Sequence, residues 1–125
     1  MAKLTEPPDG IIITIPMKAI EEKGGYREFL EEFMVCMEDE SFHTSYWIKA
    51  GNKPKHDVLD VYLCIGGKIR FKCTFVESHG AGEIELDRGK MYGRGWIVCT
   101  GPAEKPPKPI YKQGFQGFRY TQTLF

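Results

Sequence analysis

Aromatic and basic side chains are concentrated in the stretch YWIKAGNKPK near the middle of the chain. An aromatic ring can stack on a nucleic-acid base, which contributes about 1–3 kcal/mol, and a lysine can neutralise a phosphate. This combination suits a single strand or a flipped-out base better than the groove of a duplex. The stretch therefore predicts a ligand-binding lip formed by Tyr46, Trp47, Lys49, Lys53 and Lys55. In the alternative interpretation, Trp47 packs in the core and the lysines belong to a solvated loop.

Three arginines outside this stretch have aromatic or basic neighbours and extend the predicted site. Arg70 lies between Lys68 and Lys72 on a predicted strand, where all three would share the outer face. Arg94 would share a strand face with a tryptophan two residues later, and Arg119 lies in an aromatic tail. We therefore add Arg70, Arg94 and Arg119 to the predicted ligand-binding residues. A solvated outer face is the alternative for such alternating bases.

The sequence contains no recognisable catalytic or metal-binding motif. None of its three histidines belongs to an H-E-x-x-H motif, and none of its four cysteines forms a C-x-x-C pair. Ser78 directly precedes His79, but adjacent side chains of an extended chain point in opposite directions. We therefore expect no metal, no cofactor and a binding protein rather than an enzyme. The alternative is a small hydrolase of a modified nucleoside, in which Lys49 would act with Glu77 or Glu83 in acid–base catalysis.

Composition and charge describe one globular domain with an uneven distribution of charge. The 125 residues are 42% hydrophobic and 27% charged, which is ordinary for a folded domain. The formal net charge is zero, but residues 1–45 carry four basic and ten acidic side chains, whereas residues 46–125 carry thirteen and seven. This asymmetry favours a basic surface for an anionic partner, unless acidic helices neutralise the basic strands. Without a secretory signal, a long apolar run or a disulfide framework, we expect a cytoplasmic protein that does not contact membranes.

Hydrophobic periodicity predicts two helices before a set of short strands. After an irregular segment at residues 1–10 and a strand at 11–15, a short helix is expected at residues 17–23, ended by Gly24 and Gly25. Strands are expected at residues 42–49, 58–65, 69–76, 83–86 and 91–100. Between the short helix and these strands, apolar residues at helical spacing form a stripe that should cover the core. The stripe consists of Tyr26, Phe29, Leu30, Phe33, Met34 and Met37.

Residues 101–125 form a proline-rich segment and then an aromatic tail. The segment GPAEKPPKP is too rich in proline for the interior of a sheet, whereas the tail can add an edge strand or a covering flap. We predict a single α+β domain over residues 1–125, with a small curled β-sheet or pseudobarrel of five to six mostly antiparallel strands and one or two N-terminal helices. Exposed aromatic rings in the tail would instead favour a homodimer, or a structural or interaction protein of a phage or mobile element.

The two strands on either side of Gly66 and Gly67 pose a question of register. Their apolar faces coincide only if Leu63 lies opposite residue 69 or 71, whereas a simple two-residue turn would place it opposite Arg70. We therefore predict a loop with an odd number of residues, Gly67 at positive φ, and a β-bulge. A two-residue turn would instead require both faces of the hairpin to be covered.

The order of these elements resembles the PUA-like superfamily of small pseudobarrels, which includes the ASCH and EVE domains. The resemblance covers roughly residues 11–100 and rests on the N-terminal strand and helix, on YWIKAGNKPKHDVLDVYLCIGGKIRFKCTFVE and on YGRGWIVCTGP. It implies binding of nucleic acid or of a modified base and, in a few ASCH-type members, hydrolysis of a modified nucleoside. The ASCH pattern Gly-x-Lys-x-x-Glu-x-Arg does not occur in the chain.

Overall fold

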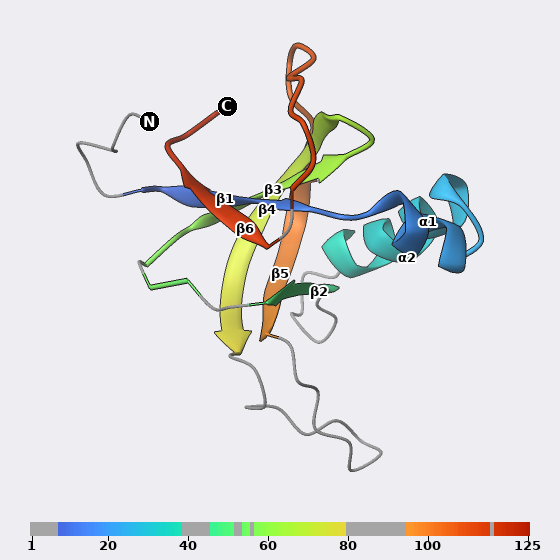
Figure 1. Ribbon diagram of the computed structural model, residues 1–125, viewed down its shortest axis with the longest axis horizontal. Helices are drawn as coiled ribbons and strands as arrows, with labels where there is room; N and C mark the ends of the chain where they lie inside the picture. The colour runs from blue at the N-terminus through green and yellow to red at the C-terminus, as the bar shows by residue number, and fades with distance from the viewer. Residues whose placement is uncertain (1–7, 39–45, 52–53, 56, 80–94, 116) are drawn as a thin grey trace.

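The computed structural model describes residues 8–38, 46–51, 54–55, 57–79, 95–115 and 117–125. These residues form a six-stranded sheet and two helices (Figure 1). The elements are β1 (Gly10–Thr14), α1 (Met17–Glu22), α2 (Tyr26–Glu38), β2 (Tyr46–Gly51), β3 (Asp60–Ile65), β4 (Lys68–His79), β5 (Gly95–Glu104) and β6 (Phe118–Thr121). The predicted α+β class with N-terminal helices is confirmed. The strand predicted at residues 83–86 lies outside the described residues.

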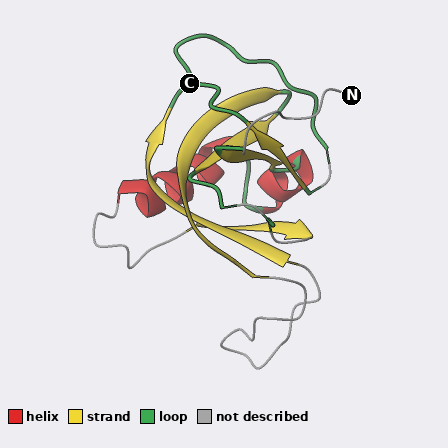
Figure 2. Cartoon of the chain, turned by 90° about the vertical axis from the view of Figure 1, so that its left-hand side faces the viewer, coloured by secondary structure: helices red, strands yellow, loops and turns green. Residues whose placement is uncertain are grey.

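The strands follow the order β2-β5-β4-β3-β1-β6 across the sheet. Among the described strands, β1 and β3 are the parallel pair, and the other neighbours are antiparallel. β2 and β6 form the two edges, so the sheet is curled but does not close into a barrel (Figure 2). Both helices lie on one side of this curled sheet. In the described part of the chain, neither helix is both long enough and apolar enough to cross a membrane.

α2 covers the inner face of the sheet with the predicted apolar stripe. Phe29 and Phe33 are fully buried, and their stacked rings have centroids 5.6 Å apart. Phe33 also contacts Phe71 of β4, with ring centroids 5.1 Å apart. Because burying one such side chain contributes about 1.5–3 kcal/mol, these contacts fix the helix to the sheet. The other stripe residues are buried or partly buried in the same core, namely Tyr26, Leu30, Met34 and Met37.

A two-residue turn joins β3 to β4. Ile65 pairs with Lys68 on either side of Gly66 and Gly67. The two glycines have φ angles of 62° and 80°, in the region that two-residue hairpin turns require and that L side chains rarely adopt. The predicted positive φ of Gly67 is confirmed, whereas the predicted odd-numbered loop is wrong.

A β-bulge next to this turn supplies the register that the apolar pattern requires. Leu63 pairs with Phe71, but Cys64, the next residue of β3, pairs with Ile69. Arg70 is therefore the extra residue on β4, and it shifts the alternation of the strand. Phe71 faces the core under α2, whereas Ile69 packs in a second cluster on the outer face. The bulge is confirmed, but the expectation that residues 69 and 71 share a face is wrong.

The C-terminal segment covers the outer face of the sheet. Tyr62 is fully buried there against Ile110, Phe115 and Phe125. The Tyr62 hydroxyl accepts a hydrogen bond from the backbone N–H of Leu124 at 2.9 Å. β6 extends the sheet beside β1, so the tail supplies both the edge strand and the flap that the sequence predicts. Both faces of the hairpin are covered, as a two-residue turn requires. Of the aromatic residues in the tail, Phe115, Phe118, Tyr120 and Phe125 pack against one of the two hydrophobic clusters, whereas Tyr111 is exposed.

β5 continues further than its proline-rich sequence predicts. The pattern predicts an end at residue 100, but the strand extends through Pro102 to Glu104, which pairs with Lys72 of β4. Gly101 lies within this extension, against the last turn of α2. A Cβ atom at this position would overlap the carbonyl oxygen of Met37. The glycine therefore allows the helix to approach the backbone of β5 closely.

We expect Phe33→Ala to lower the free energy of unfolding by about 3–5 kcal/mol, because it leaves a cavity between α2 and the sheet. Urea denaturation monitored by circular dichroism measures the change. Val35→Ala is the matched control on the same helix, since Val35 is 65% exposed and its truncation should change stability by no more than about 0.5 kcal/mol. Equal effects of the two substitutions would contradict the packing of α2.

Gly101→Ala should lower the free energy of unfolding by about 1–3 kcal/mol, because the added methyl group displaces a backbone carbonyl rather than a side chain. Gly114→Ala is the control, since its Cβ would meet only the side chain of Thr14, at 3.2 Å. We expect that change to cost about 0.5 kcal/mol or less. Thermal unfolding of both variants tests this order, and a more damaging Gly114→Ala would contradict the close approach of α2 to β5.

Candidate anion-binding site

Tyr46 lies in the core, so its assignment to a ligand-binding lip is wrong. Its side chain is 8% exposed, and its ring meets those of Phe29 and Phe33 edge-on at centroid distances of 5.9 and 5.3 Å. The cause is the alternation of β2, which turns Tyr46 and Ile48 toward α2. Because aromatic residues occupy both positions 46 and 47, the sequence alone does not determine which of them faces inward.

Among the other predicted binding residues, the structure describes the side chains of Lys55, Arg70 and Arg119. The structure does not describe the side chains of four predicted binding residues, namely Trp47, Lys49, Lys53 and Arg94. Lys55 is exposed, and its backbone N–H donates to the hydroxyl of Tyr120 at 2.6 Å. Arg119 is exposed on the outer face, with its guanidinium 4.3 Å from the ring centroid of Phe115.

Arg70 lies next to the hairpin turn and faces α2, whereas Lys72 contacts the ring of Phe125 on the outer face. The prediction that these two residues share the outer face is therefore wrong, because the bulge interrupts the alternation between them.

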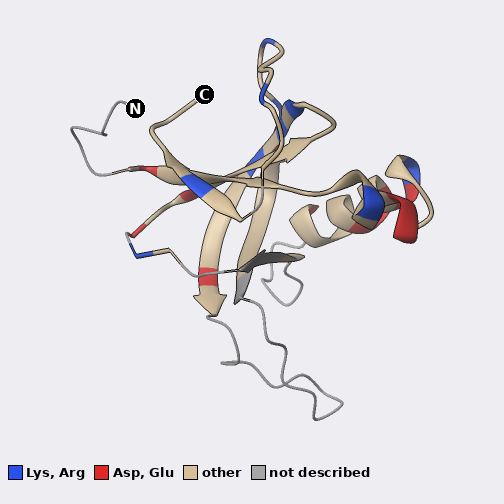
Figure 3. Ribbon diagram, in the orientation of Figure 1, with Lys and Arg blue, Asp and Glu red and all other residues tan. Residues whose placement is uncertain are grey.

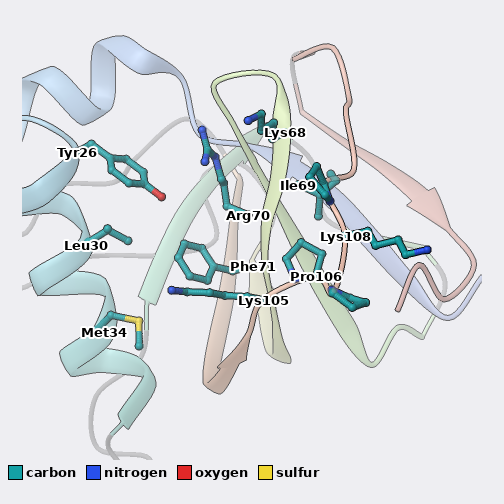
Figure 4. Close-up of a pocket in the computed structure, with 12 residues that line it drawn as sticks. Tyr26, Leu30, Met34, Lys68, Ile69, Arg70, Phe71, Lys105, Pro106 and Lys108 are labelled. Carbon is teal, nitrogen blue, oxygen red and sulfur yellow. The ribbon is translucent and has the colours of Figure 1, made fainter.

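A pocket of about 500 Å³ lies between α2, the tip of the β3–β4 hairpin and residues 105–109 (Figure 4). Tyr26, Leu30 and Met34 form its helix wall, and Phe71 forms part of the opposite wall. The proline-rich segment contributes three prolines. Four cationic residues line the space, and none of the twelve described lining residues is acidic. The cations are Lys68, Arg70, Lys105 and Lys108.

Arg70 faces α2 and is held there by a hydrogen bond and a ring contact. The Nε–H of Arg70 donates to the carbonyl oxygen of Ile65 at 3.1 Å, and its guanidinium lies 5.7 Å from the ring centroid of Tyr26. Figure 4 shows the side chain reaching from β4 toward this tyrosine. One donor of the planar guanidinium is thus bound to the backbone, which orients its two terminal nitrogens. Such a fork matches the geometry of a phosphate or a carboxylate.

Lysines from two different parts of the chain complete the positive charge. Lys105 reaches toward α2 beside Phe71, whereas Lys68 lies at the hairpin tip and Lys108 points away from the centre of the pocket (Figure 4). Sequence reasoning missed Lys105, Lys108 and Tyr26. The lysines lie more than thirty residues after Arg70 in a segment interpreted as an excursion, and the tyrosine is part of a core stripe. The excess of basic residues after position 45 is the signal that pointed toward such a surface.

The glutamates of the helices do not neutralise this pocket. Those of α2 are exposed and absent from its lining. Two of them form ion pairs on the helix surface, Lys23 with Glu32 at 2.9 Å and Arg27 with Glu31 at 3.6 Å. Figure 3 shows basic residues at the hairpin tip and on the loop above it, with acidic residues on the helices. The local charge of the pocket is therefore positive although the chain is neutral.

Within the described residues, no group of three or more histidine, cysteine, aspartate or glutamate side chains is arranged to hold a metal ion. Comparison of the chain with models of protein families, with curated proteins and with solved structures found no match. The chemistry of the pocket therefore has to be inferred from its own residues.

Burial, followed by the charge of Glu32, raises the pKa of Tyr46. Because a phenol in the unfolded chain ionises near pH 10, folding free energy is lost as the pH rises above that value, by up to about 1.4 kcal/mol per pH unit. We expect Tyr46→Phe to remove this component, so that its stability relative to the wild type improves between about pH 10 and 11. Denaturation at several pH values measures the difference. Tyr111→Phe is the control for loss of a hydroxyl, and an identical pH dependence in Tyr46→Phe and the wild type would contradict the buried phenol.

Proposed function

We propose that the pocket between α2, the hairpin tip and residues 105–109 binds a nucleotide or a single-stranded nucleic acid. The observation that carries the proposal is the lining, in which four cations and, among the described residues, no carboxylate surround a space of about 500 Å³. Protein ligand pockets span about 300–1,000 Å³, so this size fits one nucleotide unit. Cations gathered around one space repel each other, and an anionic ligand relieves that repulsion.

The cations supply phosphate recognition. Arg70 is oriented by its hydrogen bond to Ile65, so it loses less side-chain entropy on binding than a free arginine. Its terminal nitrogens can donate to two oxygens of one phosphate, and such charge-assisted bonds are roughly twice as strong as neutral ones. Lys105 approaches the same space as a mobile point charge. A phosphate therefore binds between Arg70 and Lys105.

The apolar part of the pocket supplies recognition of a base. Tyr26 offers an aromatic ring, and Leu30, Met34 and Phe71 form apolar walls beside the cations. A planar heterocycle linked to a phosphate uses both kinds of surface, whereas inorganic phosphate uses only one. This division of the lining favours a nucleotide unit over a simple anion. The PUA-like resemblance implies the same class of ligand, although the pocket lies beside the hairpin tip rather than at Trp47.

A cytoplasmic location belongs to the same proposal. All four cysteines are buried, and none of them forms a disulfide. Free thiols persist in a reducing compartment, where single-stranded nucleic acids and nucleotides also occur. The buried thiols therefore support the cytoplasm as the place where this protein meets its ligand.

We expect Arg70→Gln to weaken binding of a fluorescein-labelled octanucleotide about tenfold or more, because it removes charge-assisted bonds worth about 1.5–3 kcal/mol. Fluorescence anisotropy of RNA and DNA single strands, titrated at several salt concentrations, measures the affinity. The slope of log K against log salt should become shallower by about 0.7 for each phosphate that the variant no longer neutralises.

Arg27→Gln is the matched control, because it removes the same charge from an exposed position that pairs with Glu31 outside the pocket. Its affinity should stay close to that of the wild type. An equal decrease in affinity in both variants would show that net charge alone determines binding, and it would contradict binding in the pocket. Absence of saturable binding to both an octanucleotide and AMP at low salt would contradict the function itself.

A further inference from the structure

Tyr111 is an exposed aromatic residue next to the hairpin tip. Its side chain is 72% exposed, which leaves most of an aromatic ring in water. The other aromatic residues of the tail behave differently, since Phe115, Phe118, Tyr120 and Phe125 pack against one of the two hydrophobic clusters. An exposed aromatic ring beside a basic pocket is the kind of surface on which a base stacks.

The backbone holds Tyr111 in place on both sides. The carbonyl oxygen of Ile110 accepts a hydrogen bond from the N–H of Ile69 at 2.8 Å, and the N–H of Lys112 donates to the carbonyl oxygen of Gly67 at 3.0 Å. A β-bridge pairs Tyr111 itself with Lys68. The ring is therefore presented from a segment fixed to the hairpin, which lowers the entropy lost when a base stacks on it.

One cation connects this ring to the pocket. The Nζ atom of Lys68 lies 5.4 Å from the ring centroid of Tyr111, and the same lysine lines the pocket. The exposed turn of Gly66 and Gly67, which carries no side chains, directly precedes Lys68. A Cβ atom built on Gly67 would meet no atom within 4 Å, so the turn is open there. A Cβ atom on Gly66 would lie 3.7 Å from a terminal nitrogen of Arg70 and 3.9 Å from the sulfur of Met17, so this half of the turn borders the pocket arginine.

We infer that the ligand is a single-stranded polymer rather than a mononucleotide. One nucleotide occupies the pocket against Tyr26 and Arg70, the strand crosses the glycine turn, and a neighbouring base stacks on Tyr111. Lys68 neutralises the phosphate between the two positions. This inference rests on the proposed function, because it extends the same site along the strand.

The test compares an octanucleotide with AMP on the wild type, Tyr111→Ala, Tyr111→Phe and Arg70→Gln. Anisotropy of the labelled octanucleotide gives its affinity, and isothermal titration calorimetry gives that of AMP. We expect Tyr111→Ala to weaken octanucleotide binding about 5- to 100-fold, because it removes one stacked base, and to leave AMP binding unchanged. Tyr111→Phe keeps the ring and should stay within about twofold of the wild type for both probes. Because Tyr111 is exposed, both Tyr111 variants should unfold at the same thermal midpoint as the wild type.

The outcomes separate this inference from the proposed function. If Arg70→Gln weakens binding of both probes about tenfold or more while Tyr111→Ala binds the octanucleotide as the wild type does, the strand path is wrong and the pocket remains the proposed site. If AMP binds as tightly as the octanucleotide, the ligand is not a polymer and the inference fails alone. If the wild type binds neither probe, both proposals fail. If Tyr111→Phe weakens octanucleotide binding as much as Tyr111→Ala does, the hydroxyl rather than a stacked ring touches the ligand, and the inference fails.

Discussion

The β-bulge at Arg70 is the constraint on which the arrangement of this domain depends. A hairpin closed by Gly66 and Gly67 with regular pairing would place Leu63 opposite Arg70 and bring a charge into the core. The extra residue restores the pairing of Leu63 with Phe71. Arg70 stays on the side of α2 without a cross-strand partner, and the carbonyl oxygen of Ile65 accepts its Nε–H. One local irregularity thus completes the core and positions the principal cation of the pocket.

The two-residue turn explains why Ile69 belongs to the second hydrophobic cluster, because it places Ile69 opposite Cys64. Ile69, on the turn side of the bulge, faces outward with Tyr62, so the outer face of the sheet requires a cover of its own. The C-terminal segment provides it, and the hydrogen bonds of Ile110 and Lys112 with the hairpin carry the chain back over the tip. Tyr111 lies between them and is presented beside Lys68. The exposed ring is therefore a geometric consequence of covering the outer face, and it lies next to a basic side chain.

Hydrophobic periodicity and the residues of the turns predict most of the fold, because both depend on interactions between residues that are close in the sequence. The apolar stripe of α2, the positive φ of Gly67 and the bulge all follow from hydrophobic spacing and backbone sterics. The site is harder to predict, because it depends on which segments meet. Lys105 lies far from Arg70 in sequence and comes beside it only because β5 continues past Pro102. Tyr46 shows a different limit, since two adjacent aromatic residues make the inward side of a strand ambiguous until α2 is placed.

The zero net charge of the chain bears on how the pocket could attract the proposed anionic ligand. At an ionic strength of 0.1 M, charges separated by more than about 10 Å are largely screened, so the acidic side chains on the surface of the helices have little effect on the potential inside the pocket. Because the net charge of the chain is zero, long-range attraction of a polyanion is weak, and the proposed binding depends on short-range interactions. Arg70 is oriented for such interactions, and the apolar side chains of Leu30 and Met34 line the same pocket. The proposed recognition therefore depends on the shape of a phosphate and its attached ring rather than on total charge, because both the oriented guanidinium and the apolar wall act only at short range.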